Sequence, residues 1–434
     1  MKFTKMSLVA ALLIGSSAFA IENIKVAGDA KLFYSTQDDE YTTTDASLFD
    51  KKSSTGQAAL GLGATADLTT GVSAGAHLTG LSTLGLEGQL VNNVWEGTNG
   101  TKDYYLFDEA WLAGTVANTT AKVGRMTLDT PLVFTEKWSI AKNTFESAVL
   151  LNTDIPDTTV VGAYVGGTNS NNIVNPVTGS SRENGSQFTG FGNAAGTMQK
   201  VDSNGQTNFS QFYNGAYAAG AINNSFKPLT AQAWYYNATQ YLNAYWLQAD
   251  LSINNILAGL QYTNTNYTKS TELPIAKDAS NNAVAAMLGY ELKDAFTAKV
   301  SYSQTAKEED SSLALGSGAN LAGSQSKLYT EAWWKYGMVT KADTKAFNVT
   351  LTAPVADLFT TGLYYTQATN GKNGVSAATE KDFKEATFEV TKAFGPLAVG
   401  VYYIYTQDDA TNIKAGDTKG SAFNTVQTYL TYSF

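Results

Sequence analysis

The chain has 434 residues, of which 43% are hydrophobic, 12% aromatic and only 15% charged, whereas a soluble chain usually carries about 25% charged residues. It has no cysteine and a single histidine, His77, which excludes disulfide scaffolds, thiol catalysis and the common structural zinc sites and leaves little scope for histidine chemistry. The many glycines, tyrosines and phenylalanines, set against seven prolines, indicate a large, aromatic-rich β protein.

The N-terminal residues have the features of a secretory signal peptide. Two lysines precede an apolar run over 6–14, and the small residues at 18–20 form an A-x-A cleavage site. We therefore expect residues 1–20 to be removed on export, which leaves a single domain over 21–434. The net charge of −9 argues against nucleic-acid binding, and the rest of the chain has no run of about 18 apolar residues that would predict a membrane-spanning helix.

Alternation between apolar and other residues, which is typical of strands with one face in lipid, recurs along the chain. The first apolar row runs from Ile24 to Tyr34, and later rows cover 58–64, 72–78, 256–262, 296–302, 386–390 and 397–405. These rows carry almost no charge, as contact with hydrocarbon requires, whereas a soluble sandwich would show more charge along its strands. Charged residues on the opposite face are predicted to line a pore: Lys25, Asp29, Lys31, Lys299, Glu385 and Glu389.

The last segment shows the same pattern. Its apolar face consists of Val426, Thr428, Leu430, Tyr432 and Phe434, on which the sequence stops. Bacterial barrel proteins end in a similar way, and this likeness implies recognition by the barrel-insertion machinery. We therefore expect a transmembrane antiparallel β-barrel.

The strand count follows from parity. The alternating segments are odd in number, whereas a single-chain barrel with both termini at one end needs an even number. We assign the segment that fits worst, Lys327 to Tyr336, to a long outer loop over roughly 306–342. This leaves eighteen strands, although sixteen also fit. A barrel of this size encloses water, and we expect 167–208 to form another outer loop.

Tryptophans are expected at the membrane interfaces, where their amphipathic rings anchor a barrel. The candidates for such girdle positions are Trp95, Trp111, Trp234 and Trp246.

A charged segment follows the strand predicted over 120–125. It contains Pro131 and charges of both signs, which make poor lipid contacts, so we expect this third loop to fold into the lumen, although a loop that projects outward also fits. Charges of both signs across a pore set its selectivity. The residues predicted to narrow the pore are Asp129, Glu136, Lys137, Lys142 and Glu146.

Three short motifs within 120–145 carry a family resemblance. The run TAKVGR at 120–125, LDTPL at 128–132 and NTF at 143–145 resemble the signature of OprD-type porins and of the epsilonproteobacterial major outer membrane porins. The resemblance implies an 18-stranded barrel, an inward third loop, and a constriction with a basic and an acidic side. It assigns Lys122 and Arg125 to the basic side and Asp129 to the constriction loop. Because the chain has only two arginines, lysines are expected to replace the arginine ladder of that family.

These features predict a porin of the bacterial outer membrane, through which ions and small polar solutes diffuse passively without a cofactor, a metal or catalytic residues. The expected partners are outer membrane lipids and lipopolysaccharide, the insertion machinery and the solutes, and a homotrimer fits this class. Two alternatives are a structural or adhesive surface protein that acts through 167–208, and a barrel enzyme in which His77 serves as a base.

Overall fold

The computed structural model describes most of the chain after its first twenty residues. The described residues are 21–38, 47–82, 84–85, 90–91, 104–137, 140–169, 210–269, 277–307, 316–323, 325–371, 381–409 and 422–434. The predicted signal peptide lies outside them, as does the outer loop predicted over 167–208 except for its first three residues. Within these ranges, no helix is long and apolar enough to cross a bilayer.

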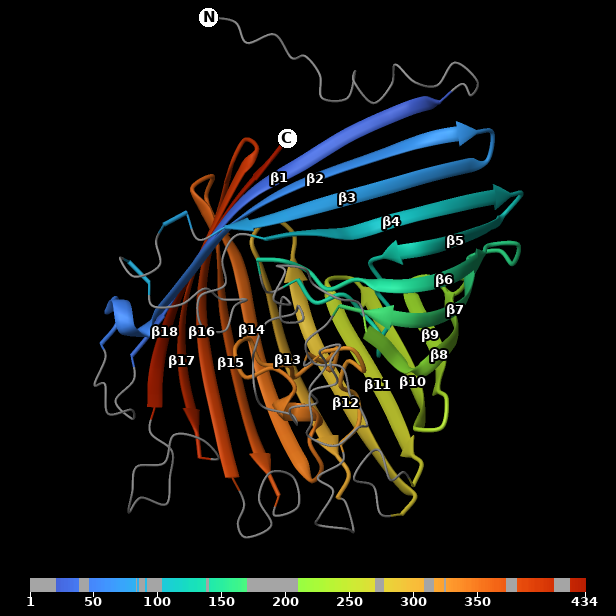
Figure 1. Cartoon of the computed structure of the whole chain (residues 1–434). Coiled ribbons are helices and arrows are strands. Elements are labelled where there is room, and N and C mark those ends of the chain that lie inside the picture. Colours follow the sequence, from blue (N-terminus) through green and yellow to red (C-terminus); the bar gives the residue numbers. More distant parts are fainter. Residues whose placement is uncertain are drawn as a thin grey trace, which may run out of the picture.

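Eighteen antiparallel strands form the fold (Figure 1). They are β1 (Glu22–Gln37), β2 (Ser54–Thr69), β3 (Val72–Ser82), β4 (Tyr104–Val116), β5 (Thr119–Met126), β6 (Phe145–Asn152), β7 (Thr158–Thr168), β8 (Ser210–Asn223), β9 (Leu229–Ala238), β10 (Leu242–Ile253), β11 (Ile256–Tyr267), β12 (Ala279–Leu292), β13 (Phe296–Thr305), β14 (Thr344–Val355), β15 (Phe359–Asn370), β16 (Lys381–Phe394), β17 (Leu397–Asp408) and β18 (Ala422–Ser433). Two 3-10 turns, η1 (Lys51–Ser53) and η2 (Met338–Thr340), interrupt the connections.

The sheet closes on itself. Each strand pairs with its neighbours in sequence, and β18 pairs with β1 from Asp29↔Ser433 to Gln37↔Thr425. Gly28 and Phe434 extend this seam, because each donates its N–H to the carbonyl of the other, at 2.8 and 2.9 Å. Closure pairs the two edges that an open sheet would leave free, and it makes the barrel a single unit.

The connections differ at the two ends of the barrel. At the end that holds both termini, which we call the turn end, strands join through short turns at 70–71, 117–118, 153–157, 224–228, 254–255, 293–295, 356–358 and 395–396. Most connections at the opposite end, the loop end, are longer. The expectation of eighteen strands is confirmed, and the segment from Lys327 to Tyr336 is indeed part of a connection, between β13 and β14.

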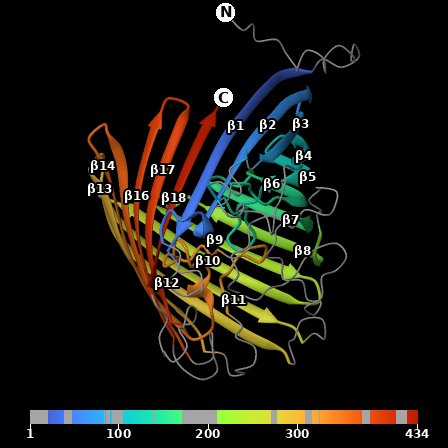
Figure 2. The same cartoon turned by 60° about the vertical axis from the view of Figure 1, so that its left-hand side comes forward.

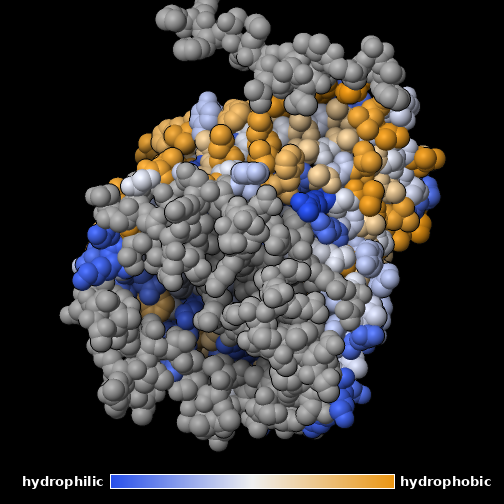
Figure 3. All heavy atoms as spheres, viewed as in Figure 1, coloured by the Kyte–Doolittle hydropathy of each residue, from blue (hydrophilic) through white to orange (hydrophobic). Residues whose placement is uncertain are grey.

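The two faces of the wall differ as the alternation predicts. Leu60, Val123 and Leu260 are more than half exposed on the outer face, whereas Thr263 and Ser303 on the inner face are fully buried. Figure 3 shows apolar residues gathered over the outer face nearest the termini and hydrophilic residues near the loops. Alternation thus gives the cylinder an apolar outside and a polar inside, as a membrane barrel requires.

The interface positions predicted for the tryptophans are wrong wherever the structure describes them. Trp234 and Trp246 are 5% and 0% exposed and pair across β9 and β10 on the inner face. Trp111 also faces inward, beneath the ammonium group of Lys122, and Trp95 lies outside the described residues. Trp234 lies flat over Gly220, where a Cβ atom would come within 2.2 Å of the indole. The exposed outer aromatics are mostly tyrosines: Tyr164, Tyr217, Tyr235, Tyr245, Tyr262, Tyr302, Tyr365, Tyr403 and Tyr405.

Candidate functional site

The third loop folds inward, as expected. We call residues 127–137 and 140–144 the first inward segment. Its tip is a tight turn, in which Thr130 N–H donates to the Val133 carbonyl at 3.1 Å and Thr135 N–H to the Leu128 carbonyl at 2.8 Å. Apolar residues at this tip are buried against the inner wall, with Leu132 1% exposed and its N–H 3.3 Å from the hydroxyl of Tyr236 on β9. The buried tryptophans of β9 and β10 belong to the same apolar cluster.

A second connection also lies inside the barrel. Residues 316–323 and 325–343, which we call the second inward segment, belong to the connection from β13 to β14 and lie inside the barrel (Figure 2). Ser317 contacts Thr265 on β11, and Thr330 contacts Ser303 on β13 at 2.6 Å. Near its middle, the Tyr329 hydroxyl donates to Asp250 on β10 at 2.5 Å. The sequence placed this segment in an outer loop, so its inward path is a correction.

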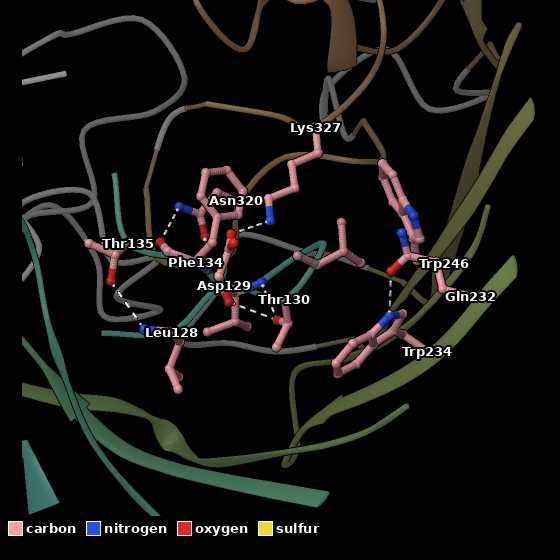
Figure 4. A network of polar contacts seen from close by, with 12 residues as sticks. Leu128, Asp129, Thr130, Phe134, Thr135, Gln232, Trp234, Trp246, Asn320 and Lys327 are labelled. Atoms are coloured by element: carbon pink, nitrogen blue, oxygen red, sulfur yellow. Dashed lines mark hydrogen bonds and ion pairs between the residues drawn. The ribbon is translucent and has the colours of Figure 1, made fainter. Parts of the chain in front are cut away.

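The two inward segments bind each other. The Asn320 amide donates to the Phe134 carbonyl at 2.9 Å and accepts the Phe134 N–H at 3.2 Å (Figure 4). Glu136, 2% exposed, accepts from the Asn320 amide and from the Gln325 N–H, at 3.0 and 2.8 Å. Lys327 forms an ion pair with Asp129 at 2.5 Å. The segments therefore form one strap across the lumen rather than two separate loops.

Two buried carboxylates hold the second inward segment in place. Glu385, on the inner face of β16, accepts the N–H groups of Trp333, Trp334 and Lys335 at 2.6, 2.9 and 2.8 Å. Glu331 lies within the segment and accepts from the Gly337 N–H at 2.6 Å and the Ser326 N–H at 2.9 Å. Burial raises the pKa of Glu331 to about 8 even though these donors favour its charged form.

A group of charged side chains lies on the inner wall opposite β16. Lys122 of β5 sits 3.9 Å above the ring of Trp111, and Lys142 of the first inward segment contacts Glu109 of β4. On β3, His77 Nδ1 lies 2.6 Å from Asp108, which also accepts from Thr79 at 3.0 Å. Asp108 is thus a carboxylate partner for His77 that the sequence did not reveal, because the two are thirty-one positions apart.

Most predicted site residues lie on the inner face or on the inward segments. Asp29 and Lys31 form an ion pair at 3.2 Å on β1, and they share their face with Lys25. Lys299 and Glu389 also face inward, on β13 and β16. Asp129, Lys137 and Lys142 belong to the first inward segment. Glu136 and Glu385 are each 2% exposed, so they fasten the strap rather than face water.

Arg125 and Glu146 do not belong to this site, which corrects their assignment to the constriction. They pair across β5 and β6, and the Arg125 guanidinium contacts Glu146 at 3.0 Å. Arg125 alternates with the exposed Val123, and Glu146 alternates with the exposed Leu150, so both side chains lie on the outer face. The alternation of Arg125 with Val123 predicts an outward side chain, whereas the family resemblance placed Arg125 on the basic side of the pore.

The sequence missed three of the residues that fasten the strap. Asn320, Glu331 and Lys327 carry no recognisable motif, and their partners lie far away along the chain. The unusual Trp333-Trp334 pair, which interrupts the alternation, was the one available signal. Among the residues that the structure describes, no group of three histidine, aspartate or glutamate side chains has the arrangement of a metal site.

Comparison with known proteins points to one fold. No protein-family model matches the sequence, and no curated protein matches it by sequence. Solved structures do match over almost the whole chain. OccAB1 of Acinetobacter baumannii superposes with a TM-score of 0.69 at 13% identity, covering 97% of this chain and 98% of that one. The chain has the fold of the Occ-type porins.

Two further structures with this porin fold agree. OccK8 (OprE) of Pseudomonas aeruginosa gives a TM-score of 0.67 at 14% identity, covering 96% of this chain and 99% of that one. A BenF-like porin from Pseudomonas fluorescens Pf-5 gives 0.66 at 11% identity, covering 95% and 99%. The fold implied by the short motifs at 120–145 is therefore confirmed. At such low identity the residues that line the interior differ, so the solutes must be argued from this chain.

Proposed function

We propose that the protein is a porin of the bacterial outer membrane, in which ions and small polar solutes diffuse passively through a water-filled lumen. The observation that carries this proposal is the opposite polarity of the two faces of a closed eighteen-stranded wall. Side chains cannot fill a barrel of this strand number. An apolar outer face fits lipid, and a polar inner face fits water.

Selectivity in this proposal comes from the strap and the charged wall beside it. Lys122, Lys142 and Lys137 supply positive charge, and Asp129 and Glu109 supply negative charge, on the first inward segment and on β4 and β5. Charges of both signs across a narrow aqueous passage set a local field, so width and charge placement together select solutes. Lysine is a point charge without the bidentate fork of arginine, so recognition of carboxylates should be loose.

Several features of the proposal follow from a barrel in that membrane. The predicted signal peptide directs export, and the last strand, which pairs with β1, carries the end pattern read by the insertion machinery. Lipids and lipopolysaccharide contact the outer face, and a homotrimer remains compatible with it. No cofactor is needed, because solutes move down their own gradients.

Planar-bilayer recording tests the proposal directly. Purified, folded protein should insert in discrete steps, each adding a constant ohmic conductance in potassium chloride. Folded protein that inserts into vesicles but carries no current would favour the structural or adhesive alternative instead. Catalysis by His77 predicts a different result, because His77→Ala would then abolish a measurable hydrolytic activity. We expect that variant to conduct like the wild type.

A further inference from the structure

A chamber lies between the second inward segment and the turn end of the barrel. Its volume is about 900 Å³, enough for a small solute with its water. The lining combines aromatic rings with neutral polar side chains: Trp333, Tyr402, Tyr429, Thr360, Thr391 and Gln427. The chamber opens on the lumen between the strap and the turn end, so a solute that has passed the strap can enter it.

The rings are arranged as a continuous platform. Trp333 of the second inward segment stacks on Tyr402 of β17 with centroids 4.8 Å apart and planes at 27°. It also contacts Tyr364 of β15 at 5.4 Å, and Tyr429 of β18 meets Tyr402 edge-on at 5.6 Å. Rings from three strands and the strap therefore form one patch of the chamber wall.

Glycine allows the tyrosines to lie flat. Gly400 stands two positions before Tyr402 on the same face, and a Cβ atom there would lie 2.8 Å from the Tyr402 hydroxyl oxygen and 2.9 Å from its ring. Gly362 stands in the same relation to Tyr364, with a Cβ atom 2.7 Å from the ring. At both places the missing side chain lets the ring lie along the wall, where Trp333 stacks on Tyr402 and contacts Tyr364 from the lumen side. The repeated Gly-x-Tyr arrangement is thus a structural device.

Charges of both signs lie around the chamber. Lys137 and Asp357 line it, whereas Lys392, which contacts the Asp357 carbonyl, belongs to the outer face of β16. The carboxylate of Glu389 lies beside the platform, where it accepts the Tyr364 hydroxyl at 2.6 Å. A charged solute of either sign would therefore meet a like charge in the chamber as well as an opposite one. The remaining polar groups are hydroxyls and an amide, which both donate and accept hydrogen bonds.

We infer that this chamber binds a neutral sugar of pyranose size. The apolar face of the sugar ring covers the aromatic platform, and the hydroxyls at its edge exchange water for Thr360, Thr391 and Gln427. This inference rests on the proposed channel function and names the solute class of that channel. Pockets that combine an apolar surface with a few placed polar groups are typical of small-molecule sites.

The test is the current through a single channel with glucose added from the turn end. Glucose at millimolar concentration should cause brief, concentration-dependent blockades. Benzoate and benzylammonium, which offer a similar ring with a negative or a positive charge, should block less. Tyr402→Leu should weaken apparent glucose affinity about tenfold, because an aromatic contact contributes roughly that factor. Tyr402→Phe, which keeps the ring, should retain most of the affinity.

Tyr403→Leu is the matched control, since Tyr403 is the next residue on the same strand but lies on the outer face, 44% exposed. Its glucose affinity should equal that of the wild type. A conducting wild-type channel without glucose blockades would overturn the inference and leave the channel function standing, as would equal affinity in Tyr402→Leu or stronger block by either charged ring. Folded protein that carries no current would overturn both.

Discussion

Removing the carboxylate of Glu385 should release the second inward segment and widen the channel. Glu385 is 2% exposed and accepts three consecutive N–H groups, from Trp333 to Lys335, at 2.6 to 2.9 Å. In Glu385→Ala these donors lose their acceptor at once. A buried donor left unsatisfied costs about 1–3 kcal/mol, and water in the lumen can reach some of them, so we take the low end for each.

With about 1 kcal/mol for each of the three donors, the docked state of the second inward segment loses about 3 kcal/mol relative to the undocked state. This corresponds to about a 150-fold shift of the docking equilibrium toward undocked states. We expect single-channel conductance to rise and the open current to become noisy, because the strap then moves in and out of the passage. Limited proteolysis within 316–343 should accelerate in parallel. Glu385→Gln keeps one carbonyl oxygen, so it should behave between the wild type and Glu385→Ala.

The control is Lys384→Ala, one position away on the outer face of the same strand, which should conduct like the wild type. If Glu385→Ala is folded and shows wild-type conductance, noise and protease resistance, then the carboxylate does not hold the strap. The two inward segments would then not form a constriction that Glu385 fastens to the wall.

Four further outcomes are expected. Lys137→Glu and Lys142→Glu should raise cation preference, seen as a shift of the reversal potential in a salt gradient; an unchanged potential would remove them from the constriction. Arg125→Gln should leave that potential unchanged, because its ion pair with Glu146 lies on the outer face and not in the lumen. Leu260→Lys should destabilise the folded barrel by about 2–4 kcal/mol in urea titrations in vesicles, because a charge would face lipid. The raised pKa of Glu331 means that the docked segment binds a proton that the undocked one releases, so its docking should weaken from about pH 5 to pH 8. Current noise should rise over that range in the wild type, and the part of the rise between about pH 6 and pH 8 should be absent in Glu331→Gln.

Alternation predicted the wall well, because it is a local property. Each outward row, such as the one that contains Leu260, faces lipid whatever the rest of the chain does, and the inward positions of Lys31 and Lys299 follow by parity. The assignment of Lys327 to Tyr336 to a connection was correct for a related reason. A barrel with both ends of the chain on one side must have an even number of strands.

Inference from residue type failed where the position on the strand or a distant segment decides a side chain's surroundings. Trp234 and Trp246 have the chemistry of interface anchors, yet the first inward segment covers them inside the barrel. Arg125 fits a porin motif, yet the pleat of β5 turns it outward toward Glu146. In both cases residue type suggested one location and the position on the strand decided another.

The amino-acid sequence by itself determined a closed, lipid-facing barrel with a charged third loop, because period-two polarity is encoded residue by residue. Only the tertiary structure decided that a second segment, 316–343, joins that loop across the lumen. Its contacts, such as Asn320 with Phe134, span 186 positions, and no periodicity records them. They form because backbone groups brought into a closed interior must find partners, and closure determines which partners are within reach.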